Sequence, residues 1–269
     1  MRLDVILVKK ALFESREKAS LAIKSGIVWV NGQIANKPSQ LVMEGSELHI
    51  ETQKALKYVS LGGLKLEKAI LDFDLDFKDK KVLDVGASTG GFTDCSLQFG
   101  AGLVWAVDVG TNQLHPSLRQ NKKVHYIENI HIKDLTGEML DSVLFDFIVA
   151  DLSFISLGQV FSFFPKFLQS KGQVVVLLKP QFEAGRQYIG KNGIVNSEKI
   201  HLKIWNEIVA SAGSCGLFLH KACFSPVRDK NKNIEYLALF TLQPAKMPDL
   251  HEVTSRAFEE LKRLRLGKR

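Results

Sequence analysis

Small and polar residues follow the apolar runs in the middle of the chain, at the positions where strands would end. They are a glycine-rich segment at 86–91, the carboxyl groups of Asp108 and Asp151, the amide of Asn129 and the amine of Lys179. A glycine turn lets the backbone approach a ligand closely, a carboxylate accepts hydrogen bonds from hydroxyl groups, and an amine beside a carboxylate can hold or move a proton. The pattern predicts a site that binds a polar ligand and performs proton chemistry.

The glycine-rich segment is typical of a turn between a strand and a helix. A dinucleotide-binding turn needs glycine where Ser88 stands, and a P-loop needs Gly-Lys-Ser/Thr at its end, so the sequence disfavours both classes. We expect the turn to form a compact pocket for part of a small ligand. Its candidate ligand-binding residues are Asp84, Gly86, Ala87, Ser88, Thr89, Gly90 and Gly91.

Asp108 ends the strand expected after this turn. An acidic residue at this place in nucleoside-binding folds accepts hydrogen bonds from the ribose hydroxyls, although a carboxylate that only caps the next turn would fit the same position. The turn and Asp108 together favour S-adenosylmethionine, because its ribose needs an acid and its amino-acid part needs a compact turn. Asn129, after the next expected strand, is a further candidate contact.

The elements that must position these residues alternate between apolar runs of strand length and helical segments. We expect strands at 82–85, 104–107, 125–127, 147–150 and 174–178, and helices at 64–73, 92–99 and 159–168. Continuous Val, Leu and Ile runs separated by helices indicate an α/β protein with a parallel sheet covered on both faces. Such sheets bind ligands at the carboxyl ends of their strands, so the candidate residues would meet there.

The first fifty residues are organised differently. Helices are predicted over 2–12 and 15–23, followed by a hairpin at 27–34 that turns at Asn31-Gly32 and by a strand at 48–50. This order, with Ser15-Arg16 and Pro38 in sequence, resembles the S4 domain, a small RNA-binding domain. The resemblance implies that structured RNA is bound mainly through its phosphates. The candidate RNA-binding residues are Arg2, Lys9, Lys10, Arg16, Lys18 and Lys24.

The whole chain resembles the TlyA family, in which an S4-type domain is fused to an FtsJ-like ribose methyltransferase. The segments GASTGGFTD, ADLSFIS and LLKPQFE carry this resemblance in combination. It implies a Rossmann-like class I methyltransferase fold with a mostly parallel seven-stranded sheet, S-adenosylmethionine as methyl donor, and 2′-O methylation of cytidine in ribosomal RNA. We expect an S4-type domain at 1–55, a linker at 56–61, the methyltransferase domain at 62–245 and a basic helical tail at 246–269.

The resemblance also implies a catalytic Lys-Asp-Lys-Glu tetrad, which falls on Lys65, Asp151, Lys179 and Glu235. A ribose hydroxyl is a poor nucleophile and must lose its proton as it attacks a methyl group. We hypothesise that Lys179 accepts or orients that proton and that Lys65 lowers the pKa of Lys179 and stabilises the developing alkoxide. Asp151 would hold both amines, and Glu235 would orient Lys65 or the ribose.

Which lysine is the base stays open, because Asp151 and Lys65 act on Lys179 in opposite directions. Taken singly, each tetrad residue fits a structural ion pair or a cap, and only the four together favour catalysis. The arginine usual in the family's SRGG stretch is Leu61 here, which affects one RNA or inter-domain contact but not Lys65.

Composition limits the function further. The 269 residues carry a formal charge of +7, and residues 1–60 and 246–269 supply six of these excess charges. A basic end beside a nearly neutral body favours a polyanionic partner, such as ribosomal RNA or ribosomal subunits. Three separate cysteines and seven histidines without ligand spacing predict neither disulfide nor metal, and no apolar run is long enough to cross a membrane. We expect a cytoplasmic protein.

Two other functions fit parts of the sequence. An RNA-binding or ribosome-assembly factor that has lost its activity would keep the fold, but this chain retains both the glycine turn and the tetrad. Members of the family are often named haemolysins, and membrane lysis would need a long, strongly apolar amphipathic helix. The tail at 258–268 has mixed charges that favour a soluble or RNA-contacting helix.

Overall fold

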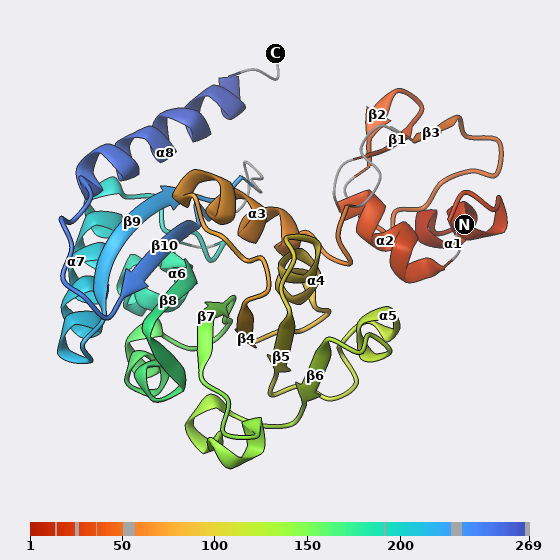
Figure 1. The fold of residues 1–269 in the computed structure, drawn as a ribbon. Coiled ribbons are helices and arrows are strands. Elements are labelled where there is room, and N and C mark those ends of the chain that lie inside the picture. Colours follow the sequence, from red (N-terminus) through yellow and green to blue (C-terminus); the bar gives the residue numbers. More distant parts are fainter. Residues whose placement is uncertain are drawn as a thin grey trace. The chain divides into compact units, whose positions relative to one another are not determined.

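The computed structural model describes residues 1–13, 15–24, 27–35, 37–50, 57–190, 192–226 and 233–266. The chain divides into two compact units, Met1–Leu61 and Gly62–Arg269 (Figure 1). Each unit has a hydrophobic core of its own.

The first unit consists of two helices and a three-stranded antiparallel sheet. The helices are α1 (Leu3–Lys9) and α2 (Arg16–Lys24), and the sheet has the order β2-β1-β3, with β1 at Val28–Val30, β2 at Gln33–Ile34 and β3 at Leu48–Ile50. Asn31 and Gly32 both have positive φ, as a two-residue hairpin turn requires. The predicted second helix, hairpin and third strand are confirmed. The core contains Leu3, Ile6, Leu7, Ala19, Ala22, Ile23, Val28 and Val30.

The first helix is shorter than the prediction. The apolar spacing predicts a helix that extends to residue 12, yet α1 ends at Lys9, and Ala11 adopts a left-handed φ of 54°. The N–H of Leu12 donates to the carbonyl of Leu7, and the N–H of Ala11 donates to that of Val8, which is the Schellman arrangement at a helix C-terminus. Because the left-handed residue is not glycine here, the sequence gives no signal for this cap.

The second unit is organised around a seven-stranded sheet. Its order is β6-β5-β4-β7-β8-β10-β9, with β6, β5, β4, β7 and β8 parallel and β10 antiparallel to both of its neighbours. The predicted α/β fold with a mostly parallel seven-stranded sheet is therefore confirmed. The strands are β4 (Lys81–Val85), β5 (Leu103–Val107), β6 (Val124–Ile127), β7 (Phe145–Ala150), β8 (Leu168–Leu178), β9 (Phe218–Phe224) and β10 (Tyr236–Thr241).

Helices cover both faces of this sheet. Leu83 and Val85 of β4 share a core with Trp205 of α7, whereas Asp84, on the opposite side of β4, bonds to Thr93 of α4. Figure 1 shows β4 in the middle of the sheet, between β5 and β7. The helices are α3 (Gly62–Phe73), α4 (Gly91–Gln98), α5 (Pro116–Arg119), α6 (Pro180–Glu183), α7 (Glu198–Ser214) and α8 (Leu250–Leu266).

The helix predicted at 159–168 is formed by tighter 3₁₀ segments and not by an α-helix. Phe161, Phe164 and Phe167 recur at every third residue, so a helix with three residues per turn places their buried rings on one side. Pro165 lies among them and has no N–H for an α-helical hydrogen bond. The two 3₁₀ segments are Leu157–Gln159 and Phe161–Phe167.

The strand order brings several chain segments to one edge of the sheet. The chain runs from β4 out to β6 and then returns to β7 on the other side of β4. Doubly wound sheets bind their ligands at such a reversal, outside the carboxyl ends of the strands. Because β10 is antiparallel and Tyr236 pairs with Leu178, β10 begins where β8 ends. Residues that follow β4, β5, β7 and β8 therefore lie near those that precede β10.

Candidate active site

The turn between β4 and α4 has a backbone that requires glycine. Gly86 has a φ of 81° and Gly90 a φ of 96°. Residues with a side chain rarely adopt this left-handed backbone conformation. A Cβ on Gly86 would lie 2.9 Å from Cδ2 of Leu152 and 3.2 Å from the carbonyl oxygen of Asp151. The glycine turn is thus in direct contact with the residues that follow β7.

Asp108 and Asn129 lie at the same edge as the turn. The Asp108 carboxylate accepts hydrogen bonds from the N–H groups of Ser88 and Gly110, at 2.7 Å and one on each oxygen. Asn129 is exposed, and its N–H donates to the carbonyl of Gly110. A carboxylate has about four lone-pair positions. Asp108 therefore caps the turn that follows it and still has acceptor capacity for a hydroxyl group.

Asp84 is placed beneath the turn and has no exposed surface. Its Oδ2 accepts a 2.6 Å hydrogen bond from the hydroxyl of Thr93 on α4, and its Oδ1 has no hydrogen-bond partner among the described residues. Burial raises the pKa of Asp84 to about 7, although the Thr93 hydrogen bond opposes the shift. In this structure Asp84 supports the start of α4 from beneath the turn, and its contact with a ligand stays a prediction.

Helix α3 positions Lys65 in its first turn. One face of α3 is buried, with residues at helical spacing, and this face anchors the helix to the second unit. Lys221 of β9 donates a 2.6 Å hydrogen bond to the carbonyl of Phe73 at the C-terminus of α3, a favourable place for a cation. The helix that carries Lys65 is thus fixed by packing and at its end. The buried residues of α3 are Gly63, Leu66, Ala69, Ile70 and Phe73.

The four predicted tetrad residues form one continuous cluster. Asp151 lies between the amines, with Oδ1 2.5 Å from Nζ of Lys179 and Oδ2 3.7 Å from Nζ of Lys65. Oε2 of Glu235 lies 2.7 Å from Nζ of Lys65. Side chains from α3 and from the ends of β7 and β8 thus meet the residue that precedes β10. The arrangement can hold two amines at a fixed separation beside the glycine turn.

The cluster is largely shielded from solvent, since the side chains of Lys65 and Lys179 are 13% and 9% exposed. Burial acts to lower the pKa of Lys65, but the carboxylates of Asp151 and Glu235 outweigh it, and the pKa of Lys65 is raised above its ordinary value. Lys65 is therefore held as an ammonium. The carboxylates of Asp151 and Glu235 compensate the charge of Lys65, which reduces the cost of burying it.

Ser153 and Phe154 lie beside the cluster and are absent from the sequence prediction. Nζ of Lys179 donates a 2.8 Å hydrogen bond to the hydroxyl of Ser153. Phe154 is 91% exposed, has a φ of 66°, and its ring centroid lies 5.1 Å from that of Phe182, which in turn lies 5.9 Å from Nζ of Lys179. An exposed ring near the amines offers a surface on which a nucleobase can stack. The signal that marks both residues is their place two and three positions after Asp151.

Glu183 fixes the segment that follows Asp151 and is also absent from the prediction. It accepts hydrogen bonds from the Ser156 hydroxyl at 2.6 Å and from the N–H of Leu157 at 2.9 Å. Burial raises the pKa of Glu183. Its place at the end of the segment LLKPQFE is the signal that could have marked it, and it joins that segment to ADLSFIS.

The lysines predicted to bind RNA lie on the two helices of the first unit or directly after the first of them. Lys9 pairs with Glu44 at 2.5 Å in an exposed salt bridge, and Lys10 is exposed after the end of α1. Lys18 and Lys24 belong to α2, and their side chains lie outside the described residues.

The two predicted arginines share one carboxylate. Arg2 donates from Nε to Oδ1 of Asp4 at 3.0 Å and from NH2 to Oδ2 at 2.9 Å. Arg16, the first residue of α2, donates from NH2 to the same Oδ2 at 3.1 Å. The structure thus brings Arg2 and Arg16 together at the beginnings of the two helices.

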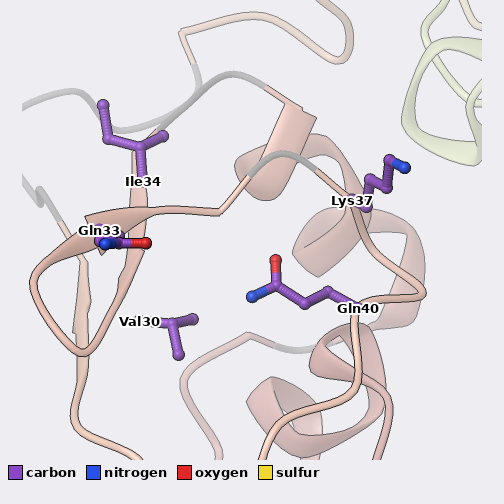
Figure 2. Close-up of a pocket in the computed structure, with 5 residues that line it drawn as sticks. All are labelled: Val30, Gln33, Ile34, Lys37 and Gln40. Atoms are coloured by element: carbon purple, nitrogen blue, oxygen red, sulfur yellow. The ribbon is translucent and has the colours of Figure 1, made fainter.

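The first unit also has a pocket of about 280 Å³ on its hairpin (Figure 2). Val30 and Ile34 contribute apolar surface, and Gln33, Lys37 and Gln40 contribute two amides and an amine. Figure 2 shows Gln40 extending from its loop towards Val30, with the amine of Lys37 directed away from that residue. The amides can donate and accept hydrogen bonds, so the lining combines apolar surface with both kinds of polar group.

The described ranges contain neither a cluster of metal-ligating side chains nor a helix suited to span a membrane. No three His, Cys, Asp or Glu side chains of those ranges converge as metal ligands would. None of the helices described there combines the length and the apolar character that crossing a membrane requires.

The sheet order, the glycine turn after β4 and the acid after β5 define a Rossmann-like class I methyltransferase fold. Comparison with known proteins agrees with this class. The model of the FtsJ-like methyltransferase family matches residues 58–241, and the model of the S4 domain matches residues 1–48.

Individual relatives define the family more closely. The chain is 35% identical to the 16S/23S rRNA (cytidine-2′-O)-methyltransferase TlyA of Mycobacterium tuberculosis over 87% of either chain, and 40% identical to hemolysin A of Brachyspira hyodysenteriae over 90% of this chain and 100% of that one. A solved structure from Streptococcus thermophilus, described as a candidate hemolysin, has a TM-score of 0.79 at 42% identity and covers 99% of this chain and 98% of its own. The chain belongs to the TlyA family of FtsJ-like methyltransferases and is an enzyme that uses S-adenosylmethionine.

Proposed function

We propose that this enzyme methylates the 2′-hydroxyl of a cytidine in ribosomal RNA, in the cytoplasm. The name of the Mycobacterium tuberculosis relative supports this substrate, as does the match of residues 1–48 to the S4 domain. The observation that carries the proposal is the contact of Gly86 with the Asp151 carbonyl. This contact sets the turn expected to hold the methyl donor directly beside the cluster of charged side chains.

The residues after β4 and β5 fit the methyl donor. The turn at 86–91 would hold its amino-acid part, and Asp108, which has acceptor capacity left, would accept from its ribose hydroxyls. Asn129 would contribute from the neighbouring turn, and Asp84 would support the site through Thr93. When bound, S-adenosylmethionine supplies a methyl group that is electrophilic because it is attached to a positively charged sulfur.

The two lysines of the cluster have different surroundings and therefore different roles. Lys65 contacts two carboxylates and stays protonated, so it stabilises negative charge that develops on the ribose oxygen. Lys179 contacts one carboxylate and the hydroxyl of Ser153, and we assign to it the acceptance of the 2′-hydroxyl proton. Asp151 keeps the two amines in place, and Glu235 orients Lys65.

Alanine substitutions of the two lysines test this assignment. We expect Lys65→Ala and Lys179→Ala each to reduce methyl transfer about 100-fold or more, because each removes a group that acts on the reacting oxygen. Affinity for S-adenosylmethionine, measured by calorimetric titration, should change little. Transfer of radiolabelled methyl groups to purified ribosomal subunits measures the rate, and mapping of 2′-O-methylated nucleotides identifies the target.

Lys68→Ala is the matched control, since Lys68 lies on the same helix and pairs with Asp72 at the surface. It should keep normal activity. Near-normal turnover in both tetrad variants would reject the catalytic assignment. Absence of any heat when the unmodified protein is titrated with S-adenosylmethionine would instead favour an RNA-binding factor without activity.

A further inference from the structure

In the cluster formed by Arg2, Asp4 and Arg16, the carboxylate is buried and the two guanidinium groups are exposed. The side chain of Asp4 is 5% exposed, whereas those of Arg2 and Arg16 are 48% and 57% exposed. The carboxylate therefore lies underneath, and both guanidinium groups face solvent. One anion and two cations leave an excess positive charge on the outer side of the cluster.

Most hydrogen-bond donors of the two arginines are not used by Asp4. A guanidinium group has five N–H donors. Arg2 gives two of its donors to Asp4, and Arg16 gives one. The NH2 groups of both arginines contact the same oxygen of Asp4, so the two planar groups converge on one point and direct their other donors away from it.

The backbone around Asp4 is fixed. The N–H groups of Leu3 and Asp4 donate to the carbonyls of Gln40 and Pro38 at 2.8 and 3.0 Å. The hydrogen bond from Arg2 lowers the pKa of Asp4 to about 2, so the carboxylate stays charged at physiological pH. Asp4 is thus a rigid, permanent anchor for the arginines.

We infer that Asp4 is a positioning residue that holds Arg2 and Arg16 together as one site for a backbone phosphate of RNA. A phosphodiester presents two charged oxygens on one phosphorus, and guanidinium groups bind such oxygens through paired hydrogen bonds. A free arginine loses rotamer freedom when it binds a ligand, and Asp4 has already restricted that freedom. The inference rests on the proposed RNA substrate and assigns it a contact site in the first unit.

The variant Asp4→Asn distinguishes two explanations of RNA binding: that Asp4 positions the two arginines, or that the arginines act only through their charge. If the arginines act only as positive charges, removing the negative charge of Asp4 strengthens RNA binding. If Asp4 positions them, Asp4→Asn weakens binding even though the net charge rises. We expect affinity to fall about threefold to tenfold, and the slope of log affinity against log salt to become shallower by about one phosphate contact.

The measurement is fluorescence anisotropy of the full chain with a fluorescein-labelled RNA hairpin that has an unpaired loop, in the absence of methyl donor. Glu44→Gln is the matched control, because it removes the same charge from an exposed pair with Lys9 in the same unit. We expect it to leave the affinity unchanged or to raise it slightly. Circular dichroism and thermal unfolding of each variant check that the first unit is folded.

Arg16→Lys provides a second test that leaves the carboxylate in place. Lysine keeps the positive charge but lacks the planar guanidinium group with its paired donors, so we expect this variant to weaken RNA binding several-fold as well. A double variant combines Asp4→Asn with Arg16→Lys. In it, adding Asp4→Asn should reduce RNA affinity by a smaller factor than Asp4→Asn does in the otherwise unmodified protein, because its effect acts partly through Arg16. A purely structural role of Asp4 predicts additive losses.

The outcomes distinguish this site from the proposed reaction. Affinity of Asp4→Asn at or above that of the unmodified protein would overturn the positioning role of Asp4. Unchanged affinity of Arg16→Lys would overturn the phosphate site. Both results would leave methyl transfer untouched. No binding of the hairpin or of ribosomal RNA by the unmodified protein would overturn both the site and the RNA substrate. Additive losses in the double variant would overturn the positioning role.

Discussion

At the scale of single residues, the buried carboxyl group of Asp84 links stability to pH. Its pKa is raised to about 7 in the folded chain, against an ordinary value of 3.8. Between these two values the folded chain keeps a proton that the unfolded chain has lost. Stability therefore decreases as pH rises from about 4 to about 7, and above that range the full cost of the buried charge is present.

Asparagine at position 84 removes this titration and keeps an acceptor for the hydroxyl of Thr93. We expect Asp84→Asn to unfold at a higher temperature than the unmodified protein at pH 8 and to gain much less at pH 5. The difference in free energy of unfolding should change by at most about 1.4 kcal/mol per pH unit. Thermal unfolding followed by circular dichroism from pH 5 to pH 8 measures it.

Comparing Asp84→Asn with the unmodified protein at each pH cancels the contribution that other titrating groups make to stability. The most relevant is His201, whose pKa is lowered by burial, so that it contributes to stability in the opposite direction. Stability profiles of the two proteins that run parallel across this range would contradict the titration of Asp84.

The residues of the site differ in how far the sequence alone could locate them. Asp151 and Lys179 follow apolar runs, and the carboxyl ends of parallel strands meet at one edge, so their proximity could be predicted. Lys65 lies on a helix and Glu235 precedes an antiparallel strand, so only the family resemblance indicated them. The contact of Ser153 with Lys179 depends on the turn after Asp151, in which Phe154 has a left-handed backbone that no local pattern encodes.

At the scale of elements, the turn expected to bind the donor requires glycine for two separable reasons. Gly90 has a φ of 96°, and a Cβ there would overlap the side chains of Leu114 and Leu118. Gly216, which follows α7, has a φ of 76° but open space around it. Alanine at Gly216 therefore adds backbone strain of about 1–2 kcal/mol, whereas alanine at Gly90 adds overpacking of about 1–3 kcal/mol to a similar strain.

Urea unfolding of Gly90→Ala and Gly216→Ala tests this difference. Both variants should have a lower free energy of unfolding, with the larger decrease for Gly90→Ala. Only Gly90→Ala should also bind S-adenosylmethionine more weakly in calorimetric titration, because it displaces the turn. Equal losses of stability, or unchanged donor affinity in both variants, would show that the packing of Leu114 and Leu118 on the turn is unimportant.

Elements with sustained periodicity were predictable, and short or capped ones were not. The parallel strands are continuous apolar runs, which fix both their positions and their burial. Over the seven residues of Phe161–Phe167, periods of 3.0 and 3.6 residues differ too little to separate a 3₁₀ from an α-helix. The end of α1 depends on the left-handed φ of Ala11, a residue type that usually continues a helix.

At the scale of the whole molecule, positive charge and the proposed chemistry are divided along the chain. Residues 1–60 and 246–269 supply most of the excess positive charge, whereas the glycine turn and the charged cluster lie between residues 65 and 235, in the nearly neutral middle of the chain. Composition indicates this division, because charge can be counted along the sequence without knowledge of the fold. The two kinds of binding should therefore respond differently to ionic strength.

Raising salt from about 50 mM to about 200 mM should weaken RNA binding about tenfold or more, because each phosphate contact releases counterions. Affinity for S-adenosylmethionine should change less than about twofold, since the hydrogen bonds proposed for Asp108 and the turn would act at short range. In methylation assays the KM for RNA should rise, while kcat at saturating RNA stays constant. Anisotropy and calorimetry measure the two affinities. Equal salt dependence of both would mean that the basic charge acts at the donor site and not on the RNA.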